Sequence, residues 1–356
     1  MLDFVNCLVW KQHGASDRVH REQVRREQQS PPANGGQVTP PRISIIIPTY
    51  NRKDLLSVTL DSFVEQGSID WECIVVDDHS DDGTLEMLAQ RARTDHRIRV
   101  MVKPNGRLRG PASGRNVGLA ESKADYVLFF DSDDLLEPGF LLETVRRMEE
   151  NQFDLLVSRI RFFHPDGTKP DVESPLIQSE SFIVRSAAAE HSVQTQNIVW
   201  KRSLLSKLDP IREDLVFGED FEYAIRGILA ADKIGIANDL FVKVRRHGDS
   251  LSFSLDRKKS IRRNLSTYDA HFLVVRSMAR SGQDYQGCLK YNFRLMYNAV
   301  SGGIRSGWLN FGFLRRQLHL LIYSLRERQF RPFFRTLLLG PSFWLIGIAR
   351  FISKTD

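Results

Sequence analysis

Residues 43–130 alternate between short apolar runs and amphipathic segments, and this alternation constrains the fold more than any other feature of the chain. Runs rich in β-branched and aromatic residues predict strands at Ile43–Thr49, Trp71–Val76, Ile98–Val102 and Tyr126–Phe130. Apolar residues at helical spacing predict helices between them, at Arg52–Gln66, Leu85–Arg93 and Pro111–Ser122. Strands joined through helices by short connections form parallel sheets. We therefore expect an α/β fold with a doubly wound, mostly parallel sheet.

The fourth predicted strand is followed by a dense group of acidic residues, namely Asp131, Ser132, Asp133 and Asp134. Carboxylates this close repel one another, and a cation among them would relieve the repulsion. Only oxygen ligands are on offer, so we expect a hard cation such as Mg²⁺, Mn²⁺ or Ca²⁺. The alternative is a solvated loop that caps a helix beginning near Pro138, because Pro favours the first helical turn.

Polar residues also follow the first two predicted strands, at Thr49-Tyr50-Asn51 and at Asp77-Asp78. In doubly wound sheets, ligands bind outside the carboxyl ends of the strands. We therefore expect these residues and Asp131–Asp133 to lie around one crevice.

Charge is unevenly distributed along the chain. Residues 251–356 hold 18 Lys and Arg against 5 Asp and Glu, whereas the whole chain has a net charge of +6. From about Asp256 onward, helical segments carry Arg on one side and Leu, Phe, Trp or Tyr on the other. The longest uncharged run of this region, Thr336–Ala349, has 14 residues. A spanning helix needs about 20, so this run predicts packing on the protein or an interfacial position on a membrane.

Three cysteines are too few and too scattered for a disulfide framework or a zinc site, and Cys73 falls in a predicted strand. A reducing, cytoplasmic setting fits this usage, with residues 310–356 as a candidate peripheral contact to the inner face of the cell membrane. Residues 1–42 predict a disordered leader, because the charge-rich VHREQVRREQQ is followed by SPPANGGQVTPPR, which has Pro and Gly and almost nothing apolar. The expected parts are thus 1–42, a folded domain at 43–255, and a helical, basic C-terminal region at 256–356.

Several segments, taken in order, resemble the pattern of glycosyltransferase family 2. They are IIIPTYNR, WECIVVDDHSDDGT, GPASGRNVGLAES and YVLFFDSDDLLEP, and the resemblance continues more loosely in FGEDFEYAIRG at 217–227 and VRRHGDSLS at 244–252. The resemblance implies a GT-A fold, which is a Rossmann-like nucleotide-binding sheet. It implies a metal-dependent hexosyltransferase that moves a sugar, with inversion, from a UDP-sugar to a hydroxyl acceptor in polysaccharide, glycolipid or cell-surface glycan synthesis. Residues 43–150 would form the nucleotide-sugar half and residues 151–255 the acceptor half.

The resemblance also implies a donor site. The nucleotide base would lie against Pro48, Thr49, Tyr50 and Asn51, and Asp78 would accept a hydrogen bond from a base N–H. Arg115 and Asn116 match a pair in which the Arg holds phosphate or the neighbouring carboxylates, with an ordinary surface Arg as the alternative. Asp131 and Ser132 would lie toward the ribose or the metal.

The metal and the catalytic acids come from three further segments that match the family. Asp133, with Asp131 and His247, would hold Mn²⁺ or Mg²⁺, although His247 would equally fit a satisfied position in a turn. Asp220 would be the general base and Glu219 would hold the acceptor, because a sugar hydroxyl must lose its proton as it attacks. The alternative is that both acids only stabilise the start of a helix.

Two rival functions remain at this stage. A nucleotidyltransferase of similar fold would need a Gly-rich phosphate loop after the first strand, which Tyr50-Asn51-Arg52-Lys53 does not provide. A catalytically inactive relative that binds a sugar or a membrane would not need Asp78, Asp131, Asp133 and Asp220 together. The expected partners are therefore a nucleotide-sugar donor and a glycan or lipid-linked acceptor, with no nucleic acid.

Overall fold

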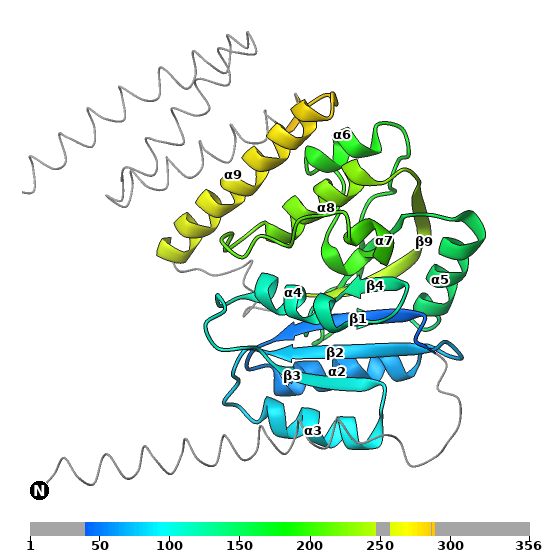
Figure 1. Ribbon diagram of the computed structural model, residues 1–356, viewed down its shortest axis with the longest axis vertical. Coiled ribbons are helices and arrows are strands. Elements are labelled where there is room, and N and C mark those ends of the chain that lie inside the picture. The colour runs from blue at the N-terminus through cyan, green and yellow to red at the C-terminus, as the bar shows by residue number, and fades with distance from the viewer. Residues whose placement is uncertain (1–39, 247–256, 286, 289–356) are drawn as a thin grey trace, which may run out of the picture. The chain divides into compact units, whose positions relative to one another are not determined.

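The computed structural model describes residues 40–246, 257–285 and 287–288, which fall into two compact units (Figure 1). Unit 1 consists of Met1–Gln152 with Val199–Ser203, and unit 2 consists of Phe153–Ile198 with Leu204–Asp356. The leader at 1–39, the predicted metal ligand His247 and the basic segment 310–356 lie outside the described residues. Within the described residues, no helix is long and apolar enough to cross a membrane. Peripheral association through 310–356 stays a prediction.

The sheet of unit 1 has the strand order β3-β2-β1-β4, with β8 added at the β4 edge (Figure 1). Its parallel strands are β1 (Ile43–Thr49), β2 (Trp71–Asp77), β3 (Ile98–Val102) and β4 (Tyr126–Phe129), and β8 (Ile198–Lys201) pairs antiparallel with β4. All residues of β2 and β4 are buried, including Glu72 and Asp77 of β2, as expected for inner strands of a sheet that is covered on both faces. Thr49 lies beside Asp77 in the ladder, so the polar strand ends meet at one edge of the sheet.

The connecting segments of unit 1 form the predicted helices, within about two residues of the predicted ends. They are α2 (Lys53–Val64), α3 (Thr84–Thr94) and α4 (Pro111–Glu121), and a short strand β5 (Leu135–Leu136) and helix α5 (Phe140–Asn151) follow β4. Helix α4 packs closely on β1 because two of its residues have no side chain. A Cβ atom on Gly118 would lie 2.4 Å from Cγ2 of Ile46, and one on Gly114 would lie 2.8 Å from Cβ of Pro48.

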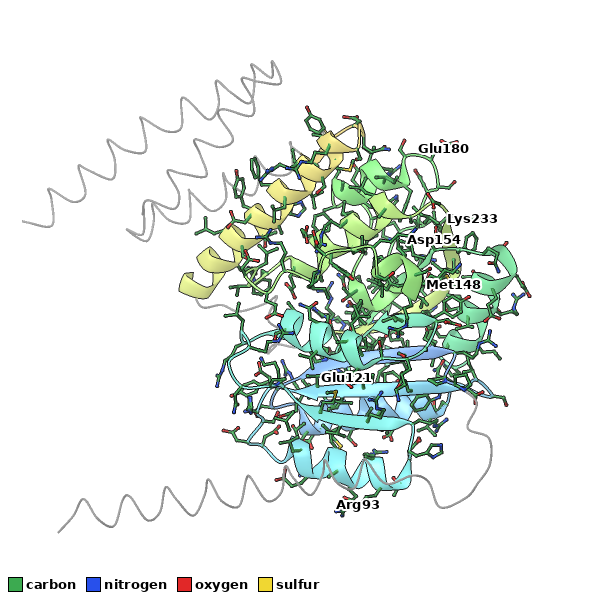
Figure 2. All side chains as sticks on the ribbon, in the orientation of Figure 1. Arg93, Glu121, Met148, Asp154, Glu180 and Lys233 are labelled. Atoms are coloured by element: carbon green, nitrogen blue, oxygen red, sulfur yellow. The ribbon has the colours of Figure 1, made fainter. Side chains whose placement is uncertain are left out.

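Unit 2 is built on a parallel strand pair, β6 (Leu155–Phe163) and β9 (Ile234–Arg245), with β7 (Val172–Glu173) antiparallel to β6. Its other elements are α6 (Phe182–Ala187), the 3₁₀ turn η1 (Thr195–Asn197), α8 (Glu219–Ala230) and α9 (Arg257–Arg280), and the short α7 (Arg202–Leu205) straddles the two units. Asp154, just before β6, accepts hydrogen bonds from the backbone N–H groups of Asp232 and Lys233 at 2.9 and 3.0 Å. Figure 2 labels Asp154 and Lys233, which join the starts of the two strands.

The sequence pattern in this region predicts a strand only at Leu240–Arg246, which is too short, because β9 begins at Ile234. The apolar pattern breaks where the β6–β9 register shifts between Ser158 and Arg159. At this break, Asn238 turns its amide to the backbone of Ile177, accepting from N–H at 2.8 Å and donating to C=O at 3.0 Å. A polar residue inside a strand therefore has a structural role that a strand pattern does not reveal.

Candidate functional site

The loops after β1 and β2 are joined to one another at the carboxyl edge of the unit 1 sheet. Asn51 has a positive φ of 50°, and its backbone N–H donates to Ser80 Oγ at 2.8 Å. The Asn51 amide donates to Asp81 Oδ1 at 2.7 Å and accepts from the Asp81 backbone N–H at 2.9 Å. The Asp78 N–H donates to the carbonyl of Thr49 at 2.8 Å. These bonds hold the segment 48–51 against the loop that follows β2.

Asp77 and Asp78, although adjacent, have different partners. The buried Asp77 carboxylate accepts hydrogen bonds from the Ser80 backbone N–H at 2.9 Å and from Ser80 Oγ at 2.5 Å, so it organises the turn. Burial raises the pKa of Asp77 above its usual value, although the hydrogen bonds from Ser80 oppose this effect. Asp77 therefore serves to start the turn that follows β2.

Asp78 is instead paired with a buried lysine, Lys103, which no motif in the sequence singles out. Lys103 Nζ lies 2.6 Å from Asp78 Oδ2, and the two side chains are only 2% and 14% exposed. Lys103 also donates to the carbonyl of Leu108 at 2.8 Å, and the Gly110 N–H donates to the same Asp78 oxygen at 3.2 Å. The loop 104–110 is thereby closed beside Asp78. The only signal in the sequence is a lysine placed immediately after a strand.

Arg115 is a buried residue of α4 that pairs with the acidic end of β4. Its Nη2 lies 2.6 Å from Asp131 Oδ1, and its side chain is 4% exposed against 34% for Asp131. The alternative of an ordinary surface Arg is therefore wrong. The close packing of α4 on β1 brings this guanidinium to the strand end, and Asn116 follows on the same helix, half-buried.

The remaining acids after β4 lie in a tight turn. Asp134 is buried, and the carbonyl of the buried Ser132 accepts a hydrogen bond from Thr59 Oγ1 of α2 at 3.2 Å. Asp133 is half-buried in the same turn. Among the residues that the structure describes, no three His, Cys, Asp or Glu side chains form a group that could hold a metal ion. The assignment of Asp131, Asp133 and His247 to a metal stays a prediction.

Glu219 and Asp220 belong to unit 2, where they are the first two residues of α8. Gly218 precedes them with a left-handed φ of 80°. Glu219 is buried and Asp220 is half-buried, and Asp220 Oδ1 accepts a hydrogen bond from the Phe221 N–H at 2.8 Å. Both acids lie where the helix dipole favours negative charge. This placement agrees with a structural role and with a catalytic one.

Comparison with known proteins points to one family. Residues 44–204 match the model of the family described as Glycosyl transferase family 2. A poly(ribitol-phosphate) beta-glucosyltransferase of Bacillus spizizenii is 31% identical over 224 residues, which are 59% of this chain and 33% of that enzyme. The match therefore spans about a third of the length of this curated relative.

Two solved structures share the fold. The S. aureus TarS fragment 1–349 in complex with UDP-GlcNAc is 18% identical, with a TM-score of 0.60 over 85% of this chain and 92% of that one. The mannosyltransferase PcManGT of Pyrobaculum calidifontis, in complex with GDP-Man and Mn²⁺, is 16% identical, with a TM-score of 0.51 over 100% of both chains. The expected GT-A fold is confirmed.

Proposed function

We propose that this chain, whose residues 44–204 match the model of glycosyl transferase family 2, is an inverting, metal-dependent glycosyltransferase that uses a UDP-sugar. The acceptor is a hydroxyl group of a glycan or lipid-linked glycan in polysaccharide, glycolipid or cell-surface glycan synthesis. One observation carries the proposal: Asp78 and Asp131, at the carboxyl edge of the sheet, are each held by a buried cation, Lys103 or Arg115. Carboxylates fixed in this way suit an edge where ligands of such sheets bind.

The contacts of Asp78 favour uracil over guanine as the base. Lys103 Nζ and the Gly110 N–H both bond to Oδ2 of Asp78. Oδ1 is then the oxygen that would accept a hydrogen bond from a ligand. Uracil presents a single imide N–H, whereas guanine presents two adjacent N–H donors that suit both oxygens of a carboxylate. The two solved neighbours hold a UDP-sugar and a GDP-sugar, so the fold by itself does not select the base.

The side chains at the end of β4 suit a hard cation, because they offer carboxylate and hydroxyl oxygens as ligands. Asp133 is the proposed anionic ligand, with Asp131, which also pairs with Arg115, and His247 as further candidates. When bound, a divalent cation neutralises charge on the departing diphosphate.

The Asp133→Asn variant tests this ligand, because a neutral amide cannot replace an anionic one. Calorimetry of UDP with and without Mn²⁺ should show that the Mn²⁺-dependent gain in affinity is lost. The exposed Asp54 of α2 offers a control, since Asp54→Asn should keep the gain. An undiminished gain in Asp133→Asn would remove this residue from the metal site.

On the acceptor side, Asp220 takes the proton of the attacking hydroxyl and Glu219 orients the acceptor. Asp220→Asn keeps the shape of the side chain but cannot accept a proton, so turnover should fall by about 10²–10⁴-fold while donor affinity persists. Glu219→Gln should act mainly on the acceptor KM.

A panel of UDP- and GDP-sugars with Mn²⁺, assayed for hydrolysis and for transfer to glycan acceptors, tests the proposed function directly. Release of UDP from one of these sugars by the wild type, but not by Asp220→Asn with acceptor present, is expected. If both acids only stabilise α8, each variant should lose melting temperature with turnover per folded molecule nearly intact.

A further inference from the structure

The backbone just before the acidic pair is tied to helix α9 by a single hydroxyl group. Phe217 N–H donates to Ser266 Oγ at 2.9 Å, and Ser266 Oγ donates to the Phe217 carbonyl at 2.9 Å. Ser266 is itself buried. One side chain therefore bonds to both backbone polar groups of Phe217, a residue that precedes the first turn of α8.

The next residue, Gly218, leaves no room between the two helices. A Cβ on Gly218 would lie 2.8 Å from Cβ of Ala270 and 3.7 Å from Cα of Thr267. Its φ of 80° is left-handed, which Gly adopts without strain. The close contact of Gly218 with α9 thus sets the direction of the first turn of α8.

Beyond the acids, the Phe221 ring stacks on His271 of α9, with centroids 4.2 Å apart and planes at 30°. Burial lowers the pKa of His271 to about 3, so the ring is neutral and stacks as an aromatic group at neutral pH. Positions 266, 267, 270 and 271 lie on one face of a helix by their spacing. This face contacts residues 217, 218 and 221, which flank Glu219 and Asp220 on both sides. Figure 1 shows α8 and α9 side by side.

We propose that Ser266 is a positioning residue for the Glu219–Asp220 pair, and that α9 belongs to the transfer machinery although it lies beyond the family match at 44–204. The inference rests on the proposed role of Asp220 as the base. A side chain in the first turn of a helix moves with the backbone that enters the turn. Displacement of a catalytic group by about 1 Å costs on the order of 10²-fold in rate. Ordinary packing of two helices predicts a loss of stability and no selective effect on the acids.

The test compares Ser266→Ala with Ser266→Thr, which keeps the hydroxyl group, and with Ser277→Ala, which makes the same change three turns along α9. Transfer kcat, donor affinity and melting temperature are measured on each full-length protein. We expect Ser266→Ala to lower kcat by roughly tenfold or more per folded molecule at unchanged donor affinity. Ser266→Thr should recover most of the loss, and Ser277→Ala should resemble the wild type.

A second comparison separates positioning from packing. In the Asp220→Asn background the base is already lost, so Ser266→Ala should cost little further turnover. An equal fold-loss in both backgrounds, or normal kcat in Ser266→Ala, overturns the proposal.

Hydrogen exchange at the backbone amides of residues 217–221 tests the tether, which is the pair of hydrogen bonds between Ser266 and Phe217, without an activity measurement. Exchange in Ser266→Ala should be faster than in the wild type there, and unchanged exchange would refute the tether. A wild type that transfers no sugar while exchange responds as expected would instead refute the proposed function.

Discussion

Replacing Lys103 by Met should destabilise unit 1, because it leaves the Asp78 carboxylate without its cation. The ammonium group is almost fully buried, 2.6 Å from Asp78 Oδ2, and it also donates to the Leu108 carbonyl at 2.8 Å. Met fills the volume of the lysine stem with a flexible apolar chain, so little packing is lost. The perturbation is therefore electrostatic and not a cavity.

The expected loss of unfolding free energy follows from the exposed fractions of the Lys103 and Asp78 side chains. Removing one member of a fully buried ion pair costs about 3–5 kcal/mol of unfolding free energy. Asp78 is 14% exposed and keeps the Gly110 N–H bond at 3.2 Å, which lowers the penalty. Loss of the bond to Leu108 adds about 0.5–1.5 kcal/mol. We expect a total loss of about 2–4 kcal/mol at neutral pH.

Urea unfolding of Lys103→Met, Asp78→Asn and the double variant measures this coupling. The double variant should be more stable than the sum of the single losses predicts, because no uncompensated charge remains. UDP affinity should fall in Lys103→Met, since both the orientation of Asp78 and the closure of loop 104–110 depend on the lysine. A loss below about 0.5 kcal/mol in Lys103→Met, typical of a surface change, would refute the reasoning.

Two further predictions concern the scaffold of unit 1. Gly118→Ala should cost about 1–3 kcal/mol in urea unfolding, because its Cβ would meet Ile46, whereas Glu121→Ala on the exposed side of α4 should change little. Burial raises the pKa of Glu72, but hydrogen bonds from Ser44, the Lys123 N–H and Arg99 outweigh it, so the pKa lies below its usual value. Glu72 then contributes stability above its unfolded pKa of about 4.3 that is lost as pH falls through the folded value. Glu72→Gln should therefore flatten the loss of stability between about pH 5 and pH 3, and an unchanged slope would contradict this assignment.

The strands and helices of unit 1 could be predicted because their patterns are local. Ile43–Thr49 and Ile98–Val102 form strands with the predicted ends, since both segments are rich in β-branched and other apolar residues. Unit 2 was predicted less well. Its strand β9 carries Asn238 and Asp239 in its middle, and the register shift that accommodates them depends on contacts with Ile177 and β6.

Part of the candidate donor site could also be predicted, because it too depends on local patterns. The acids follow strands, and strand ends of a parallel sheet meet at one edge, so Asp78 and Asp131 could be placed together from the sequence. The burial of Arg115 could not, because it depends on Gly114 and Gly118 letting α4 approach β1. A glycine in a helix is usually only a weak point for stability, and its role here becomes visible only in the packing.

The partners that orient the acids leave no pattern in the chain, and the reason is physical. Asp78 needs one cation at one oxygen, and Lys103 reaches it from the end of β3. The turn before Asp220 needs one hydroxyl group, and Ser266 supplies it from a helix 49 residues further along the chain. Many residue types at many positions could supply a single donor, so neither partner has a required spacing from the acid that it holds. The roles proposed for the acids, toward acceptor, nucleotide base and metal, restrict both their identity and their order. The residue types that the proposed chemistry needs can therefore be identified in the local sequence. The orientation of their side chains depends on single long-range contacts, which only the fold reveals.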